Sequence, residues 1–436
     1  MNKDRIVNIG IIGLGTVGTG VARVLLNQQA LLKARTSLHF RLKTISELDW
    51  TKDRELDLTG ILCTDKVDEL LEDPEISIVV ETIGGYEPAF TFISRALRNR
   101  KHVVTANKAL IATRGEELFR IAQENGVDLM FEASVGGGIP IIKGLREGLI
   151  ANRIERIIGI LNGTANYILT KMNEEGLSFD AALKQAQQKG FAEANPHLDV
   201  SGMDTAHKLA ILGSLASNTL VSVDKLYVEG ITGITSMDIE FAKSLGYVVK
   251  LLAICRQEAE GLDLRVHPTL VPVDHLLASV KQELNAVFVR GDFVGETMFY
   301  GPGAGERPTA SAIVGDIVDL SRDLLLKEGE KFSNRTISLT EHARLLPLSE
   351  VCNRFYLRFK TLDQPGVLSA ISGVLAEQGI SISSMVQLET KEQDNCVPIV
   401  LLTHEAPEKA MEAALAKIRA FDFIVEEGLR LRLFQD

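Results

Sequence analysis

The stretch from Gly190 to Lys208 contains side chains that could hold a charged substrate and move a proton. Glu193, Asp199, Asp204 and Lys208 lie in it, and a helical pattern at its end places Asp204 and Lys208 four residues apart on one face. A lysine held near carboxylates can donate and accept a proton. The helix is too apolar to be freely solvated, which favours this interpretation over an exposed ion pair contributing only about 0.3–0.5 kcal/mol.

Composition limits the classes of protein to which the chain can belong. A formal net charge of −11 and the absence of a long basic run argue against nucleic-acid binding. The four cysteines are far apart and show no metal-type spacing, so we expect reduced thiols and a cytoplasmic protein. No apolar run is long enough to suggest a membrane span.

Residues 1–145 are predicted to form a dinucleotide-binding domain. A strand over Val7–Ile12 is followed at once by a GxGxxG motif and then by a helix over Val21–Leu32. In this context the first glycine makes the tight turn, the second lets the backbone approach a pyrophosphate and the third allows helix–strand packing. The helix N-terminus then faces the phosphates. The predicted cofactor cradle is Gly13, Leu14, Gly15, Thr16, Val17 and Gly18.

The identity of the dinucleotide stays open at this point. Glu47, after a strand over Phe40–Ile45, could accept hydrogen bonds from the ribose 2′-hydroxyl of NAD. Arg41, Lys52 and Arg54 could instead hold the 2′-phosphate of NADP. The distance in sequence from the glycine motif to Glu47 is longer than usual, so neither cofactor is favoured.

Further alternation of strands and helices predicts a parallel, doubly wound sheet with ligands beyond the carboxyl ends of its strands. Lys108 and Glu132 follow two of the predicted strands, and we expect both at the ligand crevice. The predicted strands are Ile76–Thr82, His102–Thr105 and Val127–Glu132.

Residues 146–310 are predicted to form a substrate-binding and dimerisation domain. A strand over Arg153–Leu161 leads through Asn162-Gly163-Thr164 into a helix over Ala165–Met172. Later, the glycine-rich loop Gly301–Pro308 precedes a helix over Thr309–Leu326, so we expect a second backbone cradle near the cofactor. Other predicted elements are a helix over Phe179–Lys189 and strands over Val266–Val271, Ala286–Gly291 and Thr297–Tyr300.

Taken together, the motifs resemble those of homoserine dehydrogenase over nearly the whole chain. That family interconverts homoserine and aspartate 4-semialdehyde with NAD(P)H, in threonine and methionine biosynthesis. Asn195 departs from the pattern, because many members carry Asp there. The motifs that carry the resemblance are GLGTVG at Gly13–Gly18, TANK at Thr105–Lys108, EASVGGGIP at Glu132–Pro140, LNGTANYIL at Leu161–Leu169, the Gly190–Lys208 stretch and GPGAGERPTA at Gly301–Ala310.

The resemblance assigns roles to matching positions. It implies that Lys208 is the catalytic lysine, with Lys108 and Asp204 in the catalytic set. It implies cofactor contacts from the cradle and from Thr105, Lys108 and Gly303, and substrate contacts from Gly190, Glu193, Asp204 and Lys208.

A sodium site near the nicotinamide is also implied by the resemblance. The family's ligand offsets fall on Glu132, Val135, Gly137 and Ile139. The last three could bind a cation only through backbone carbonyls, which hard cations accept.

The C-terminal residues 346–436 show a βαββαβ order, which is the ferredoxin-like pattern. The turn Asp363–Leu368 resembles that of an ACT domain, which implies an amino-acid effector, here threonine. The alternative is a dimerisation module without a ligand. The predicted elements are Arg354–Thr361, Leu368–Gln378, Ile380–Leu388, Val397–Thr403, Glu408–Phe421 and Phe423–Phe434.

The predicted fold class is therefore α/β, with a Rossmann-type nucleotide domain, an α+β substrate domain and a ferredoxin-like regulatory domain. Residues 311–345 are expected to contribute a helix that returns to the nucleotide domain, followed by a linker. A homodimer or homotetramer is implied by the resemblance.

Two other functions compete with this interpretation. A semialdehyde dehydrogenase acting through a cysteine thioester is disfavoured, because no cysteine lies in the motif loops. A non-catalytic sensor of NAD(P) and amino acids would have no need of Glu193, Asp204 and Lys208 together.

Overall fold

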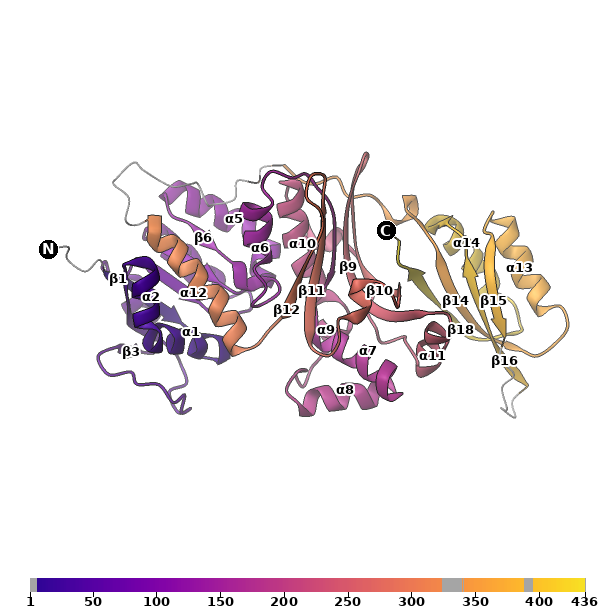
Figure 1. The fold of residues 1–436 in the computed structure, drawn as a ribbon, viewed down its shortest axis with the longest axis horizontal. Helices are drawn as coiled ribbons and strands as arrows, with labels where there is room; N and C mark the ends of the chain where they lie inside the picture. The colour runs from indigo at the N-terminus through magenta and orange to yellow at the C-terminus, as the bar shows by residue number, and fades with distance from the viewer. Residues whose placement is uncertain (1–5, 324–338, 340, 388–394, 436) are drawn as a thin grey trace. The chain divides into compact units, whose positions relative to one another are not determined.

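The computed structural model describes residues 6–323, 339, 341–387 and 395–435 (Figure 1). The end of the predicted helix over Thr309–Leu326, beyond residue 323, and Leu388 lie outside these ranges. The described residues form two compact units, which we treat separately. The first unit draws on Met1–Ile157, His207–Asp224 and Leu284–Ala343, and the second on Ile158–Ala206, Lys225–Glu283 and Arg344–Asp436.

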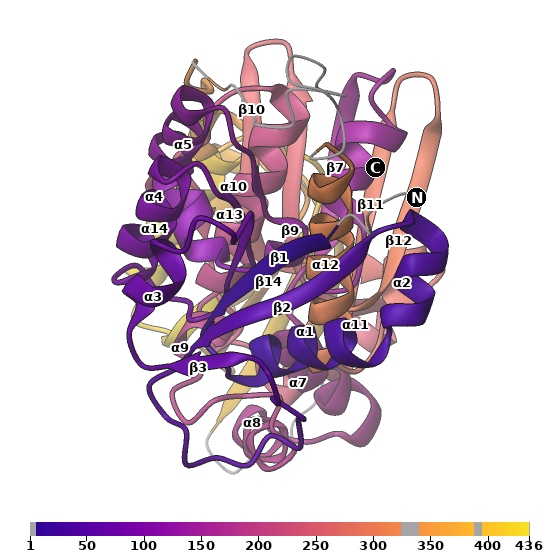
Figure 2. The ribbon, with the colours of Figure 1, turned by 90° about the vertical axis from the view of Figure 1, so that its left-hand side faces the viewer.

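The first unit contains a six-stranded parallel sheet in the order β3-β2-β1-β4-β5-β6, as the alternating pattern predicts. Helices cover both faces of this sheet (Figure 2). The strands of this sheet are β1 (Ile6–Ile12), β2 (His39–Ser46), β3 (Leu62–Thr64), β4 (Ile78–Glu81), β5 (His102–Thr105) and β6 (Leu129–Met130). The unit also contains an antiparallel hairpin outside this sheet, formed by β11 (Leu284–Gly291) and β12 (Gly295–Pro302). The helices are α1 (Thr16–Asn27), α2 (Gln29–Thr36), α3 (Val67–Leu71), α4 (Ala89–Arg98), α5 (Lys108–Asn125), α6 (Ile141–Lys143) and α12 (Glu306–Asp323).

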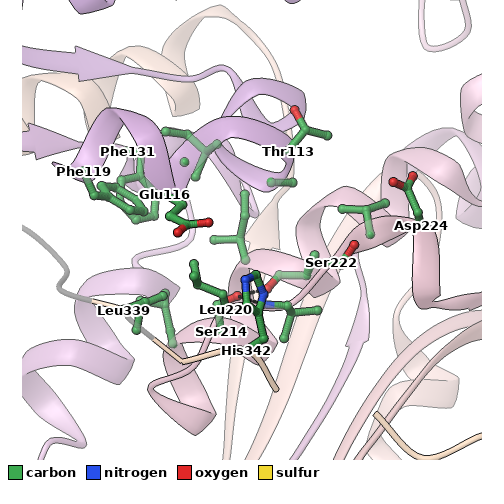
Figure 3. Close-up of a pocket in the computed structure, with 18 residues that line it drawn as sticks. Thr113, Glu116, Phe119, Phe131, Ser214, Leu220, Ser222, Asp224, Leu339 and His342 are labelled. Carbon is green, nitrogen blue, oxygen red and sulfur yellow. Dashed lines mark hydrogen bonds between the residues drawn. The ribbon is translucent and has the colours of Figure 1, made fainter. Parts of the chain in front are cut away.

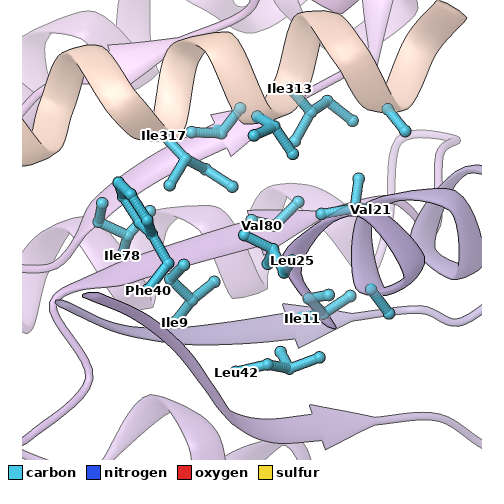
Figure 4. Packing of buried hydrophobic residues seen from close by; sticks show 14 of the residues in the cluster. Ile9, Ile11, Val21, Leu25, Phe40, Leu42, Ile78, Val80, Ile313 and Ile317 are labelled. Carbon is cyan, nitrogen blue, oxygen red and sulfur yellow. The ribbon is translucent and has the colours of Figure 1, made fainter. Parts of the chain in front are cut away.

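One apolar core fixes α1 and α12 to the same face of this sheet (Figure 4). Val21 and Leu25 of α1 and Ile313 and Ile317 of α12 are fully buried in it, against alternate residues of the strands. Gly20 permits the close approach of the two helices, because a Cβ there would lie 2.7 Å from the Glu306 side chain. A helix from late in the chain therefore completes the nucleotide-type core.

The second unit contains a run of strands in the order β9-β10-β18-β14-β16-β15, with β8 beside β10. Its strands are β8 (Tyr227–Val228), β9 (Tyr247–Glu258), β10 (Gly261–Pro272), β13 (Cys352–Asn353), β14 (Phe355–Leu362), β15 (Ile382–Gln387), β16 (Cys396–Thr403), β17 (Ala406–Pro407) and β18 (Ile424–Leu433). Its helices are α7 (Gly163–Glu175), α8 (Phe179–Gln188), α9 (His197–Val200), α11 (Ser236–Ser244), α13 (Val367–Glu377) and α14 (Glu408–Arg419). β7 (Ile154–Ile160) and α10 (Met203–Ser217) carry the chain from one unit to the other.

The C-terminal βαββαβ order is confirmed, with α13 and α14 sharing one apolar core. Gly366 has a φ of 94°, which favours glycine at the start of α13. The sheet of this module does not stand alone, because its last strand β18 pairs in parallel with β10 at Thr269–Arg432 and Leu270–Leu433.

Several elements differ from their prediction. The helix over Val21–Leu32 is two helices, α1 and α2, with a break at Gln28. The strand over Val127–Glu132 is only β6, because Phe131 leaves the extended conformation and a 3-10 turn, η1 (Glu132–Ser134), follows. The long strand β9 has no counterpart among the predicted elements, and neither has α11, although Gly246, with a φ of 80°, separates the two.

Candidate functional site

The GxGxxG loop has the geometry that its glycines predict. Gly13 has a φ of 92°, and a Cβ on Gly18 would lie 2.1 Å from the Gly13 carbonyl oxygen. A Cβ on Gly15 would meet nothing within 4 Å, so this position faces open space. Gly15 and Thr16 are exposed at the N-terminus of α1, whose free N–H groups can bind an anion.

Glu47 holds the glycine loop in place through the backbone. Its carboxylate accepts hydrogen bonds from the N–H of Leu14 at 2.5 Å and from those of Leu48 and Asp49 at 2.8 and 3.0 Å. Burial acts to raise the pKa of Glu47, but these donors and the Arg54 guanidinium outweigh it, so the pKa lies below its usual value. Because three backbone N–H groups already bind the Glu47 carboxylate, its main role is to hold the glycine loop in place and not to accept hydrogen bonds from a ribose.

Arg54 is occupied in the same way. Its Nε donates to the Leu14 carbonyl at 2.7 Å, and its terminal nitrogens donate to the Asp49 and Lys52 carbonyls. The loop after β2 is thus bonded to the glycine loop from both sides, which neither motif by itself could have indicated.

Thr105 and Lys108 lie at the carboxyl end of β5. The Thr105 hydroxyl donates to the carboxylate of Glu81, at the end of the adjacent strand β4, at 2.5 Å. Glu81 is fully buried, and burial raises its pKa above the usual value, although three hydrogen bonds act to lower it. Lys108 is the first residue of α5, and the Asn107 side chain caps that helix by accepting from Leu110 N–H at 3.2 Å.

Glu132 is buried in η1 with both carboxylate oxygens bonded. They accept from the N–H groups of Ile142 and Lys143 at 2.9 and 2.7 Å. Burial raises the pKa of Glu132 to about 7, although these donors and the charges of Lys143 and Arg146 oppose the rise. The Glu132 N–H donates to Asp316, whose own pKa burial also raises.

Two glycine-rich segments of the first unit approach each other closely at Gly137 and Gly303. A Cβ on Gly137 would lie 2.6 Å from the Gly303 carbonyl carbon and oxygen. A Cβ on Gly303 would lie 2.0 Å from Nδ2 of Asn285. Asn285 is 1 % exposed, and neither polar atom of its side chain has a hydrogen-bond partner among the described residues. The segment that resembles a sodium site thus lies directly against the second predicted cradle.

The second unit brings two of the predicted carboxylates together around one amide. Asn162 donates from Nδ2 to Asp199 Oδ1 at 2.7 Å and to Asp204 Oδ2 at 2.8 Å. Its Oδ1 accepts from the N–H of Ala165 at 2.7 Å and so caps α7. The sequence indicates Asn162 only as part of a capping loop. Its hydrogen bonds to the two carboxylates are visible only in the structure.

Glu193 and Gly190 occupy the loop before α9. Gly190 has a φ of 75°, which favours glycine, and the Glu193 carbonyl accepts a hydrogen bond from Gln187 at 3.2 Å. Glu193 is exposed, in contrast to the buried Asp204. The two predicted substrate carboxylates therefore differ in their access to water.

Asp204 and Lys208 lie one turn apart on α10 and are 6 % and 8 % exposed. This burial excludes the alternative of a solvated surface ion pair. A buried carboxylate and ammonium on one helix face can bind a polar substrate and transfer a proton to it. His207 is also buried.

A pocket of about 170 Å³ in the first unit is lined by α5, α10 and the segment after α10 (Figure 3). Phe119 and Phe131 lie at one end and Ser214 and His342 at another. None of the predicted site residues lines it. It does show that α5, which begins with Lys108, lies beside α10, which carries Lys208.

Comparison with protein families gives three matches along the chain. Residues 13–132 match "Homoserine dehydrogenase, NAD binding domain", residues 140–318 match "Homoserine dehydrogenase" and residues 355–423 match "ACT domain". No helix in the described ranges is long and apolar enough to cross a membrane.

Individual proteins agree with these matches. The homoserine dehydrogenase of Pseudomonas aeruginosa is 43% identical over 432 residues, covering 98% of this chain and 99% of its own. That of Bacillus subtilis is 40% identical over 420 residues, covering 96% of each chain.

Solved structures point the same way. The crystal structure of a homoserine dehydrogenase from Thiobacillus denitrificans covers 100% of both chains at 43% identity with a TM-score of 0.94. A hyperthermophilic archaeal homoserine dehydrogenase in complex with NADPH covers 75% of this chain and 100% of its own, at 27% identity and a TM-score of 0.62.

Proposed function

Because this chain belongs to the homoserine dehydrogenase family of oxidoreductases, we propose that it interconverts L-homoserine and L-aspartate 4-semialdehyde with NADP or NAD. The observation that carries the proposal is the buried pair of Asp204 and Lys208 on α10, with Asp204 bonded to Asn162. A substrate with an ammonium group and a reacting oxygen needs both a carboxylate and a proton donor. We also propose a cytoplasmic location, in keeping with the reduced thiols that the spacing of the cysteines favours.

Each side chain has a task in the proposed reaction. When bound, the nicotinamide supplies or accepts the hydride. The Lys208 ammonium gives a proton to the developing alkoxide in the reduction and stabilises its charge, and takes the proton back in the oxidation. Lys108 polarises the same oxygen. Asp204 and Glu193 hold the substrate ammonium, and Gly190 shapes the loop that presents Glu193.

The cofactor is assigned to the first unit. The open face at Gly15 and the N-terminus of α1 fit a pyrophosphate, and Gly13–Gly18, Thr105, Lys108 and Gly303 are its proposed contacts. The NADPH complex of the archaeal relative supports NADP as one cofactor. Rates with NADPH and NADH, measured side by side by absorbance, would establish the preference.

A sodium ion is proposed at Glu132, Val135, Gly137 and Ile139. The donor class fits, because the buried Glu132 carboxylate retains lone pairs, and a cation beside it would offset the rise in its pKa to about 7. The Ile139 carbonyl already accepts from Ile141 N–H at 2.8 Å, which leaves one lone pair for an ion. Activity that does not change when choline replaces sodium at constant ionic strength would contradict this assignment.

Threonine is proposed as a feedback inhibitor acting through the ACT domain, and a homodimer or homotetramer as the assembled enzyme. Support for the inhibitor comes from the continuity of the sheet of that domain with β10 and from a buried polar connection. Arg432 of β18 donates to Glu408 of α14 at 2.5 Å and to Glu229 at 2.9 Å.

The Glu229 segment in turn packs against the loop before α10. Ile231 N–H donates to the Val200 carbonyl at 2.9 Å, and a Cβ on Gly230 would lie 2.2 Å from that oxygen. A change in the ACT domain can therefore reach the loop that carries Asp199 and leads to Asp204.

The test of the catalytic assignment is Lys208→Ala, assayed with L-homoserine and NADP or NAD. We expect kcat to fall by at least about 100-fold, the usual range for a general acid–base group, while the dissociation constant of NADPH stays within about twofold of the unmodified enzyme. Turnover near that of the unmodified chain would show that Lys208 is not the proton donor. No oxidation of homoserine by the unmodified chain would favour the alternative, a non-catalytic sensor of NAD(P) and amino acids.

A further inference from the structure

Asn162 has a donor set that its helix-capping role does not require. It is 5 % exposed and lies between the end of β7 and the start of α7, in extended backbone with a φ of −124°. Its Oδ1 must face the Ala165 N–H, because only an oxygen can accept that bond. The orientation of the amide is therefore settled, and Nδ2 faces Asp199 and Asp204.

Both hydrogens of this amide nitrogen are used on carboxylates. One goes to Asp199, in α9, and the other to Asp204, in the first turn of α10. Two carboxylates that share one nitrogen are close neighbours, so negative charge on one repels negative charge on the other. A shared donor offsets that repulsion and fixes the direction of each carboxylate.

The loop between the two carboxylates is held from its other side. Gly202 has a φ of 86°, and a Cβ there would lie 3.1 Å from Val228 and 3.2 Å from Val266. The loop therefore cannot move its backbone easily, and the side-chain orientation of Asp204 depends on its hydrogen bonds. One of these bonds comes from the amide of Asn162, which is buried and whose orientation is fixed by the bond from Ala165 N–H to its Oδ1.

We propose that Asn162 is a positioning residue for the substrate-binding carboxylate Asp204. It holds Asp204 in one orientation beside Asp199 and aims it at the ammonium group of the amino-acid substrate. The inference rests on the proposed function, because it takes Asp204 as the carboxylate that meets the substrate.

The experiment is Asn162→Asp in the full-length enzyme. Aspartate caps a helix as well as asparagine does, so the acceptor for Ala165 is kept while both donors to the carboxylates are lost. We expect kcat/KM for homoserine to fall by roughly 10- to 100-fold, the range for hydrogen bonds to charged groups. The loss should fall mainly on KM for homoserine, with KM for NADP within about twofold of that of the unmodified enzyme. Because a third buried carboxylate then faces Asp199 and Asp204, the melting temperature should also fall.

Two further variants separate positioning from capping. Asn162→Ser also keeps a cap and, with at most one donor, should show a loss in the same direction. Ser178→Ala removes the cap of α8, whose side chain accepts from Ala181 at 3.3 Å, and should lower the melting temperature without changing KM for homoserine.

The outcomes are distinguishable. The assignment would be overturned if both Asn162→Asp and Asn162→Ser kept kcat/KM for homoserine within about threefold of that of the unmodified enzyme. It would also be overturned if kcat/KM fell equally for homoserine and for NADP. An unmodified chain that does not oxidise homoserine would overturn the proposed function and this inference with it.

Discussion

At the scale of single residues, the residue type that a position tolerates can depend on one neighbouring side chain. Gly303 is the clearest case, because its missing Cβ is occupied by the side chain of Asn285. Asn285 is buried, and its amide has no hydrogen-bond partner among the described residues, which costs free energy unless a bound group or water completes it. The two residues are therefore expected to be energetically coupled.

This coupling predicts the outcome of a double-mutant cycle. Gly303→Ala should lower the free energy of unfolding by about 1–3 kcal/mol, because the new methyl group overlaps the Asn285 amide. Asn285→Ala removes that amide, so the double variant should recover most of the loss. Urea denaturation of the four proteins measures both effects, and additive losses would show that the overlap does not set the cost.

At the scale of elements, buried polar groups tie α7 to its surroundings in the second unit. Lys250 of β9 is 4 % exposed and donates to Asn166 of α7 at 3.0 Å and to the Val280 carbonyl. Asn166 in turn donates to the Val280 and Gln282 carbonyls at 3.2 and 2.9 Å. One buried cation and one amide thus connect a helix, a strand and a loop.

The titration of Lys250 gives this connection a pH dependence. Burial lowers the pKa of Lys250 to about 8, whereas in the unfolded chain it is about 10.4. Between these values the unfolded state binds more protons, so the contribution of this group to stability rises with pH. The free energy of unfolding of the unmodified chain relative to Lys250→Met should therefore rise by roughly 3 kcal/mol from pH 8 to 10.4 and be flat below pH 8.

Urea denaturation at several pH values from about 7 to 10.5 measures this difference. Lys281→Met is a second test, because Lys281 lines the same pocket as Lys250 with its side chain 58% exposed, and its charge acts to lower the pKa of Lys250. Without that charge, the rise in stability above pH 8 should be smaller than in the unmodified chain. A constant difference for Lys250→Met across the whole range would contradict the prediction.

At the scale of the whole molecule, the C-terminal module is part of the sheet of the second unit. β18 lies between β14 of the module and β10, so deletion of residues 350–436 would expose an edge of β10 and remove Arg432. A second buried connection joins the same parts, because Arg358 and Tyr356 of β14 bond to Asp238 of α11 at 2.6 and 3.1 Å. Substitution in the full chain therefore tests the proposed inhibition more cleanly than truncation.

Glu229→Ala should weaken inhibition by threonine while leaving the reaction itself intact. Arg432 keeps Glu408 as a partner, so the fold is expected to persist, but Arg432 loses its bond to the Glu229 segment, which packs against the Val200 loop through Ile231. We expect the half-inhibitory concentration of threonine to rise by about 10-fold, corresponding to about 1.4 kcal/mol of coupling.

The control for this experiment is Glu426→Ala. It breaks an ion pair with Lys360 on the same module at 3.0 Å, and exposed pairs contribute little, so inhibition should not change. Equal inhibition of Glu229→Ala and the unmodified enzyme would rule out this route of coupling.

Sequence alone was sufficient for the elements whose signals are local. The βα turn at Gly13–Gly18 requires glycine at defined positions, the strand–helix alternation predicts a parallel sheet, and the βαββαβ order of the C-terminal module is visible in its periodicity. The i,i+4 spacing of Asp204 and Lys208 likewise places both on one helix face, because that spacing is a local property of the chain.

The tertiary structure decided what depends on contacts between distant segments. Burial of Asp204 and Lys208 excludes an exposed ion pair, and no local pattern in the sequence indicates burial. Two contacts of this kind are the sharing of Asn162 by two carboxylates and the approach of Gly137, Gly303 and Asn285. Both join residues from different segments of the chain. The pairing of β18 with β10 is likewise a contact between distant segments. The sequence of β18 does not indicate which strand it will pair with on the side away from β14.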